Sequence, residues 1–134
     1  GASPPITNVE SWNGSSWTEV NDVNTAREQL SAGGKTSTSA LIFAGNQPAR
    51  SSASESWNGT NWTNTNSMNT ARGEVGGCGD SNTSSLVFGG LEPAGPAKTE
   101  SFNGTNWTEI NWIYSKYRIM EWNKLDSSKQ FKYS

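Results

Sequence analysis

The chain repeats itself every 45 residues. Glu-Ser-Trp-Asn-Gly at 10–14 returns at 55–59, and it returns again at 100–104 with Phe in place of Trp. Aligned without a gap, residues 10–54 and 55–99 are identical at 20 of 45 positions. Chance does not produce such a match, so one structural unit accounts for most of the chain.

Each unit reads as four short strands separated by turn residues. A continuous apolar run that ends in Gly is typical of a strand buried on both faces, and a Gly-rich segment before it predicts a first strand where only small residues fit. The last two strands flank an Asn-Gly loop, a strong hairpin signal because both residues tolerate a positive φ. The predicted strands are 29–34, 40–43, 54–57 and 62–66 in one unit and 74–79 and 85–88 in the next.

Aromatic residues lie symmetrically about the Asn-Gly loop in every copy. Trp57 and Trp62 flank the loop 58–61, so we expect them to form a cross-strand pair. Such a pair could stack a sugar or a base, but its recurrence at one place in each copy favours packing between units. The same reasoning pairs Trp12 with Trp17 and Phe102 with Trp107.

Composition limits the chemistry that the chain can perform. Hydrophobic residues make up 31% and charged residues 16%, whereas Ser, Asn and Thr fill 48 of 134 positions, which is turn and strand chemistry. The absence of His and the single Cys exclude Ser-His triads, a disulfide framework and zinc sites built on these residues. We therefore expect no catalytic residue, no metal, no cofactor and no enzyme activity. Cys78 replaces Gly33 of the previous copy, and we expect a small buried side chain there.

A fixed order of motifs marks the second full unit. Met-Asn-Thr-Ala-Arg at 68–72 is followed by the Gly-rich segment 73–79, by Leu-Val-Phe-Gly-Gly at 86–90, and by the copy at 100–104 with Trp107. This order resembles a kelch repeat, which has an Arg before its first strand, a Gly-Gly pair after its second and a Trp on its fourth. The first full unit departs from it, with Ala-Gly in place of Gly-Gly.

The resemblance implies a kelch-like β-propeller, a fold that closes with typically four to eight four-stranded blades. The sequence of the repeat also resembles tandem arrays in proteins of marine bacteriophages and environmental viruses, which implies a viral source. We thus predict an all-β fold with about 2.5 blades in this chain, closed by oligomerisation, or else a fragment of a longer array. Repeats span 1–111, as a half unit 6–26 and units 27–71 and 72–111, and 112–134 is a tail without repeats.

The tail carries a net charge of +3, whereas residues 1–111 carry −5. Such a weak basic excess favours a solvated or self-docking segment, and we expect no nucleic-acid partner. Segments 117–122 and 130–133 read as two strands, which is the number that the half unit lacks. Pairing of the tail with residues 6–20 would give three blades per chain and a six-bladed dimer. The alternatives are a trimer of two-blade chains and an amphipathic tail helix with Ile113, Tyr117 and Met120 on one stripe.

Charged residues recur with the repeat. Glu10, Glu55 and Glu100 occupy one position in successive copies. Paired carboxylates hydrolyse glycosides, but these copies would lie on different blades, so we expect each to make a hydrogen bond within its own blade. Arg27 and Arg72 are expected to bind backbone carbonyls or a neighbouring Glu.

The copies disagree most in a Pro-containing loop after the second strand. Loops of this kind are the natural place for a partner, although drift on a solvated loop would leave the same pattern. The candidate ligand-binding residues are Asn46, Gln47, Arg50, Leu91, Glu92 and Lys98.

These observations favour a non-catalytic, virus-encoded module that presents loops to a protein or a glycan, on a virion or outside the cell. A purely structural protein without a ligand is the second possibility, and a fragment of a kelch-like enzyme is the third. No run of about 18 apolar residues is present and the first residues lack a signal-peptide pattern, so we expect no membrane partner.

Overall fold

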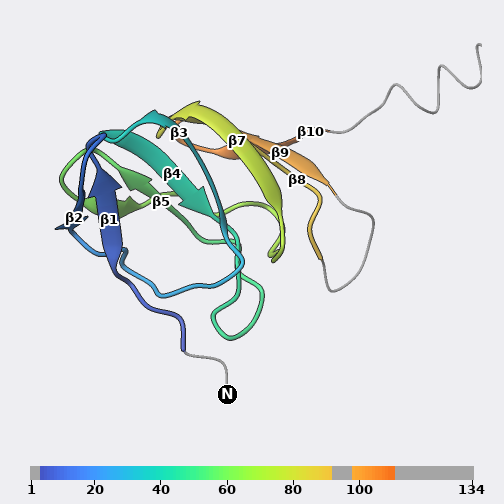
Figure 1. The fold of residues 1–134 in the computed structure, drawn as a ribbon. Coiled ribbons are helices and arrows are strands. Elements are labelled where there is room, and N and C mark those ends of the chain that lie inside the picture. The colour runs from blue at the N-terminus through green and yellow to red at the C-terminus, as the bar shows by residue number, and fades with distance from the viewer. Residues whose placement is uncertain (1–3, 92–97, 111–134) are drawn as a thin grey trace, which may run out of the picture.

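The computed structural model describes residues 4–91 and 98–110, and within these ranges the chain is all-β, as predicted. Its strands form three antiparallel sheets, and no helix occurs in these ranges (Figure 1). The first sheet is the hairpin β1–β2, and the other two contain four strands each. The strands are β1 (Val9–Trp12), β2 (Trp17–Val20), β3 (Ser31–Thr36), β4 (Ser39–Phe43), β5 (Ser54–Trp57), β6 (Trp62–Asn64), β7 (Gly76–Ser81), β8 (Ser84–Phe88), β9 (Thr99–Phe102) and β10 (Trp107–Ile110).

Each four-stranded sheet is an up-and-down meander in which neighbours in sequence are neighbours in the sheet. The register repeats with the sequence, because Phe43 pairs with Ser54 and Phe88 pairs with Thr99. The hairpin β1–β2 has the register of β5–β6 and therefore corresponds to the second half of a four-stranded sheet. The described sheets do not close into a ring (Figure 1).

The first strand of each four-stranded sheet begins two residues later than the sequence pattern predicts. Gln29 and Glu74 each have a φ of 55°, a left-handed conformation that ends a regular strand. The N–H of Glu74 donates to the carbonyl of Gln29 at 3.2 Å, so these two turns contact each other. The strand predicted at 54–57 is confirmed, whereas the one predicted at 62–66 ends at Asn64.

The hairpin loops combine a side-chain cap with one glycine at positive φ. The Oδ1 atom of Asn58 accepts the N–H groups of Thr60 and Asn61 at 2.9 Å each. Gly59 alone takes a positive φ, 94°, so the Asn acts through its side chain and not through a left-handed backbone. The same caps form at Asn13 and Asn103.

The two four-stranded sheets pack through their Gly-rich first strands, β3 and β7, which lie side by side (Figure 1). A Cβ atom on Gly33 would lie 2.8 Å from the Cα of Gly79, and one on Gly77 would lie 2.5 Å from the ring of Phe43. Only glycine permits this approach, as the sequence predicts. The core between the sheets consists of Leu41, Phe43, Ala44, Met68, Val87, Phe102 and Trp107.

The tail 112–134 lies outside the described residues, and with it the two strands predicted at 117–122 and 130–133 and the alternative helix. Within the described ranges, no helix is long and apolar enough to cross a membrane.

Candidate functional site

Each four-stranded sheet contains one buried Arg–Glu ion pair. The Nη2 atom of Arg27 donates to Oε1 of Glu55 at 2.9 Å, with both side chains at most 1% exposed. Its Nη1 atom donates to the carbonyls of Ala44 and Ala53 at 3.1 and 2.7 Å. The free oxygen of Glu55 accepts the N–H of Asn24 at 2.7 Å. The pair therefore ties together the ends of β4 and β5 and the segment before β3.

The second sheet repeats this arrangement. Arg72 donates to Glu100 at 2.8 Å and to the carbonyls of Gly89 and Lys98, and Glu100 accepts the N–H of Asn69 at 2.7 Å. Both glutamates thus make the predicted hydrogen bonds within their own sheet. Their two oxygens are committed to structural donors, which does not suit them to act as general acid and base.

Burial of the arginine has an electrostatic cost. It lowers the pKa of Arg27, and the charge of Glu55 and its hydrogen bond oppose that shift. The Nε atoms of Arg27 and Arg72 are buried without a partner in the described chain. Glu10, the equivalent glutamate of the half unit, is exposed on β1. It therefore differs from the predicted glutamate with a hydrogen bond inside its own blade, because the half unit has no arginine segment beside it within the described residues.

The predicted ligand-binding residues fall into different environments. Gln47 is exposed at the tip of the loop after β4, Arg50 is half-buried, and Asn46 bridges to Gln29 through its Nδ2 atom. Leu91 is exposed after β8, and its backbone pairs with Gly73. Lys98 forms an ion pair with Glu109 at 3.0 Å, and Glu92 lies outside the described residues.

Hydrogen bonds hold the two ends of the loop after β4. The two carbonyls that Arg27 binds, those of Ala44 and Ala53, bracket the loop at its ends. The N–H of Ser51 donates to the carbonyl of Gly45 at 2.7 Å inside it. The variable residues therefore sit on a fixed frame, the arrangement by which rigid scaffolds present binding loops.

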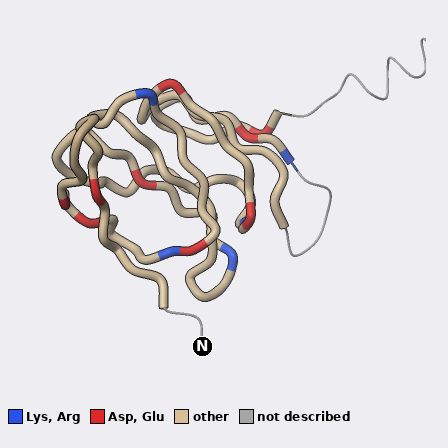
Figure 2. Tube along the Cα trace, viewed as in Figure 1, with Lys and Arg blue, Asp and Glu red and all other residues tan. Residues whose placement is uncertain are grey.

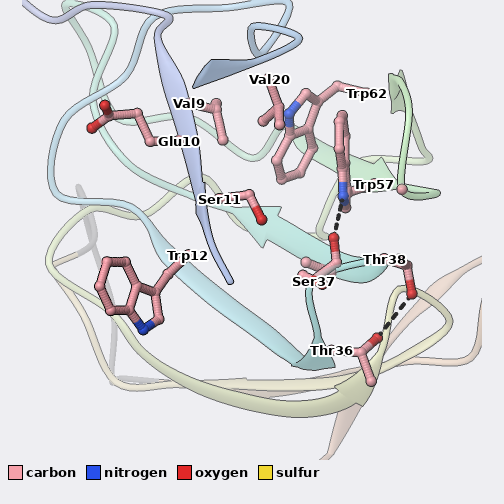
Figure 3. Close-up of a pocket in the computed structure, with 12 residues that line it drawn as sticks. Val9, Glu10, Ser11, Trp12, Val20, Thr36, Ser37, Thr38, Trp57 and Trp62 are labelled. Atoms are coloured by element: carbon pink, nitrogen blue, oxygen red, sulfur yellow. Dashed lines mark hydrogen bonds between the residues drawn. The ribbon is translucent and has the colours of Figure 1, made fainter. Parts of the chain in front are cut away.

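A cavity of about 390 Å³ lies between the hairpin β1–β2 and the sheet β3–β6 (Figure 3). Val9 and Val20 of the hairpin and Trp57 and Trp62 of the sheet line it. The Nε1 atom of Trp57 donates to the carbonyl of Ser37 at 2.9 Å. The Nε1 atom of Trp62 is buried and has no partner in the described chain. The cavity borders the edge of β1 that has no strand beside it in the described sheets.

The predicted aromatic pairs are confirmed, with ring centroids 5.1 to 5.3 Å apart. Their burial depends on the neighbouring sheet. The fourth-strand tryptophan is 63% exposed as Trp17, half-buried as Trp62 and 6% exposed as Trp107. The second-strand phenylalanine is 0% exposed as Phe43 and 44% exposed as Phe88. The exposure of these equivalent residues therefore follows how far another sheet covers them.

The prediction that Cys78 is buried is wrong. Its counterpart Gly33 is buried because Gly79 and Ser85 of the next sheet cover it. In the described chain no sheet covers that face of β7, so Cys78 is exposed and lines an open hollow of about 440 Å³ with Phe102.

Charged groups are dispersed over the described surface and do not gather into one patch in the view of Figure 2. The described residues contain no group of three or more His, Cys, Asp or Glu side chains placed to hold a metal ion.

Comparison with protein-family models and with curated proteins finds no match to this chain.

Sequence reasoning missed the polar partner of the buried indole. Trp107 donates through Nε1 to the Oγ of Ser54 at 3.1 Å, across the contact between the two large sheets. The signal was available in one alignment column, where Val9, Ser54 and Thr99 are equivalent.

Proposed function

We propose that the chain is a non-catalytic interaction module built from kelch-like β-propeller blades, closed by association of copies. The observation that carries the proposal is the contact of β3 with β7, since two meander sheets that pack through Gly-rich first strands have the arrangement of neighbouring blades. The repeat of 45 residues matches the sheet register and supports the same reading. On its motifs alone, the repeat also supports a viral source.

The module binds a protein or a glycan through the loops that follow the second strand of each blade. Gln47 and Leu91 are exposed there, and Arg50 is half-buried. The arginine clamp fixes both ends of the first loop, so its sequence can vary without loss of the fold. Repetition of blades places several such loops on one end of the module, which favours multivalent binding.

The test is a printed array of glycans and immobilised proteins probed with labelled chain. We expect wild-type protein to bind at least one class of spot, and the double variant Gln47→Ala/Arg50→Ala to lose at least about tenfold in affinity, the size of one lost polar contact to a charged group. Thr60→Ala, at the hairpin loop on the opposite end, is the matched control and should bind normally. Equal loss in the control would contradict binding through the loops.

A structural role without a small ligand is the second candidate. The exposed apolar residues at the two ends of the described sheets favour it, because such surfaces mark sites of association. A chain that assembles but leaves every spot of the array unoccupied would support this role instead.

A further inference from the structure

The described sheets form an arc with an apolar surface at each end. One end, which we name the tryptophan end, exposes the pair Trp12 and Trp17 on the hairpin β1–β2. The other, the phenylalanine end, exposes Phe88, Leu91 and Ile110 on and beside β8 and β10. These are most of the large hydrophobic side chains that the described residues leave exposed.

The contact between the two large sheets shows what each end fits. In that contact Trp107 packs edge-on against Phe43, with ring centroids 5.2 Å apart and an interplanar angle of 71°. Its Nε1 atom donates to the Oγ of Ser54 at 3.1 Å. Trp107, Phe43 and Ser54 are all buried. One tryptophan, one ring and one hydroxyl thus make the central part of this interface.

The two ends carry the unmatched halves of the same contact. Phe88 and Thr99 are the equivalents of Phe43 and Ser54, one repeat of 45 residues later. Trp17 is the equivalent of Trp107, two repeats earlier. At one end Phe88 is 44% exposed and Thr99 is half-buried, and the equivalent of the tryptophan that packs on such a pair is 63% exposed at the other end.

We propose that a second copy of this chain docks its tryptophan end on the phenylalanine end of the first. Trp17 of the second copy packs on Phe88, and its indole N–H donates to the hydroxyl of Thr99. The residue at the hydroxyl position supports this choice. Where the sheet β3–β6 lies beside the hairpin β1–β2 of the same chain, the equivalent residue is Val9, and the indole of Trp62 has no acceptor in the described chain. The free end retains the hydroxyl.

The interface joins unlike surfaces, so each copy has one of each to offer and successive copies continue the arc until it closes. This inference rests on the blade arrangement of the proposed function, and it names the surfaces through which the copies associate. It differs from a symmetric contact of two tryptophan ends, for which the chain contains no internal example.

The experiment measures the solution mass of the full chain, of Trp17→Ala and of Phe88→Ala by light scattering during size exclusion. We expect wild type at a multiple of 14.4 kDa and both variants at the monomer mass. Both residues are exposed in the single chain, so folding should survive each change, which circular dichroism checks. Ile6→Ala is the control: Ile6 is exposed and apolar but belongs to neither of the two named ends, so this variant should keep the wild-type mass.

Mixing the two variants separates unlike from like surfaces. Each variant retains the half that the other lacks, so an equimolar mixture should recover a species heavier than the monomer with one intact interface. Wild type that stays monomeric at all concentrations, or Phe88→Ala that keeps the wild-type mass, would overturn the proposal. A mixture that stays monomeric would overturn it as well.

The hydroxyl has its own pair of variants. Thr99→Val keeps the shape and removes the acceptor, and we expect association about fivefold weaker, the effect of one net hydrogen bond. Thr99→Ser should associate like wild type, and a Thr99→Val protein that also does so would contradict the predicted hydrogen bond. A monomeric chain that still binds the array through its loops would refute this interface and the closure by association of copies, and would leave the proposed binding through loops standing. A chain that assembles without binding the array would support the interface and contradict the proposed binding.

Discussion

At the scale of residues, one hydroxyl decides whether a buried indole is satisfied. Trp107 has the Oγ of Ser54 as acceptor, whereas Trp62 has none in the described chain, and the equivalent of Ser54 beside its cavity is Val9. We expect Val9→Ser to raise the free energy of unfolding by about 1 kcal/mol, because it gives the Nε1 of Trp62 a partner. Ser54→Val should lower it by about 1–3 kcal/mol. Urea unfolding followed by circular dichroism measures both.

The control for Val9→Ser is the same change in a Trp62→Phe background. Phenylalanine has no N–H to satisfy, so the gain should vanish there if it comes from this hydrogen bond. If the gain in unfolding free energy persists in that background, it comes from another effect of the serine and not from this hydrogen bond.

The buried ion pair gives a second prediction for single residues. Arg72→Met should destabilise the chain by about 3–5 kcal/mol, because it leaves the carboxylate of Glu100 buried without its charge partner. Lys35→Met is the comparison: its ion pair with Asp80 is exposed, and its loss should cost less than about 1 kcal/mol. Thermal unfolding of the two variants at one pH decides, and equal shifts would contradict the assignment of Arg72 as a clamp.

At the scale of elements, local sequence patterns predict that a strand is present better than they predict where it begins and ends. The Asn-Gly loop predicts the hairpin of β5 and β6 and its aromatic pair, because both depend on neighbours in sequence. The start of β3 depends on the left-handed turn at Gln29, for which no glycine signals a positive φ. The environment of Cys78 depends on whether another sheet covers β7, which no local pattern contains.

The candidate site divides in the same way. The repeated charges predict that Arg27 binds carbonyls and a glutamate, since position and residue type suffice for that inference. The cavity beside Trp62 depends on how the hairpin sits against the next sheet, so the sequence alone could not predict it.

Packing of the first strands gives the prediction for elements. Gly33→Ala would place a Cβ 2.8 Å from the backbone of Gly79, so β3 and β7 must separate, and we expect a loss of about 1–3 kcal/mol. The matched change is Cys78→Ala at the same repeat position, where the side chain is exposed and the loss should stay below about 0.5 kcal/mol. Similar losses for both, measured by urea unfolding, would show that the contact of the two strands is not what requires glycine.

At the scale of the whole molecule, every unit depends on the next one for its core. Phe43 is buried by the sheet that follows it, and Phe88 is not. A chain of this size buries a modest fraction of its surface, so covering the two ends should add to its stability. The assembly should therefore be more stable than the single folded chain.

This dependence predicts a melting temperature that rises with protein concentration, because association stabilises the folded state by mass action. The dilute chain should melt earlier, and its total tryptophan fluorescence should shift to longer wavelength as the ring of Trp17 returns to water. Trp17→Ala should melt at one temperature across the same series, since it lacks the contact, and Ile6→Ala should follow wild type. Calorimetry at several concentrations measures the effect. A wild-type melting temperature that does not change with concentration would mean that the single chain is stable with both ends uncovered, and the apolar ends would then need a different partner.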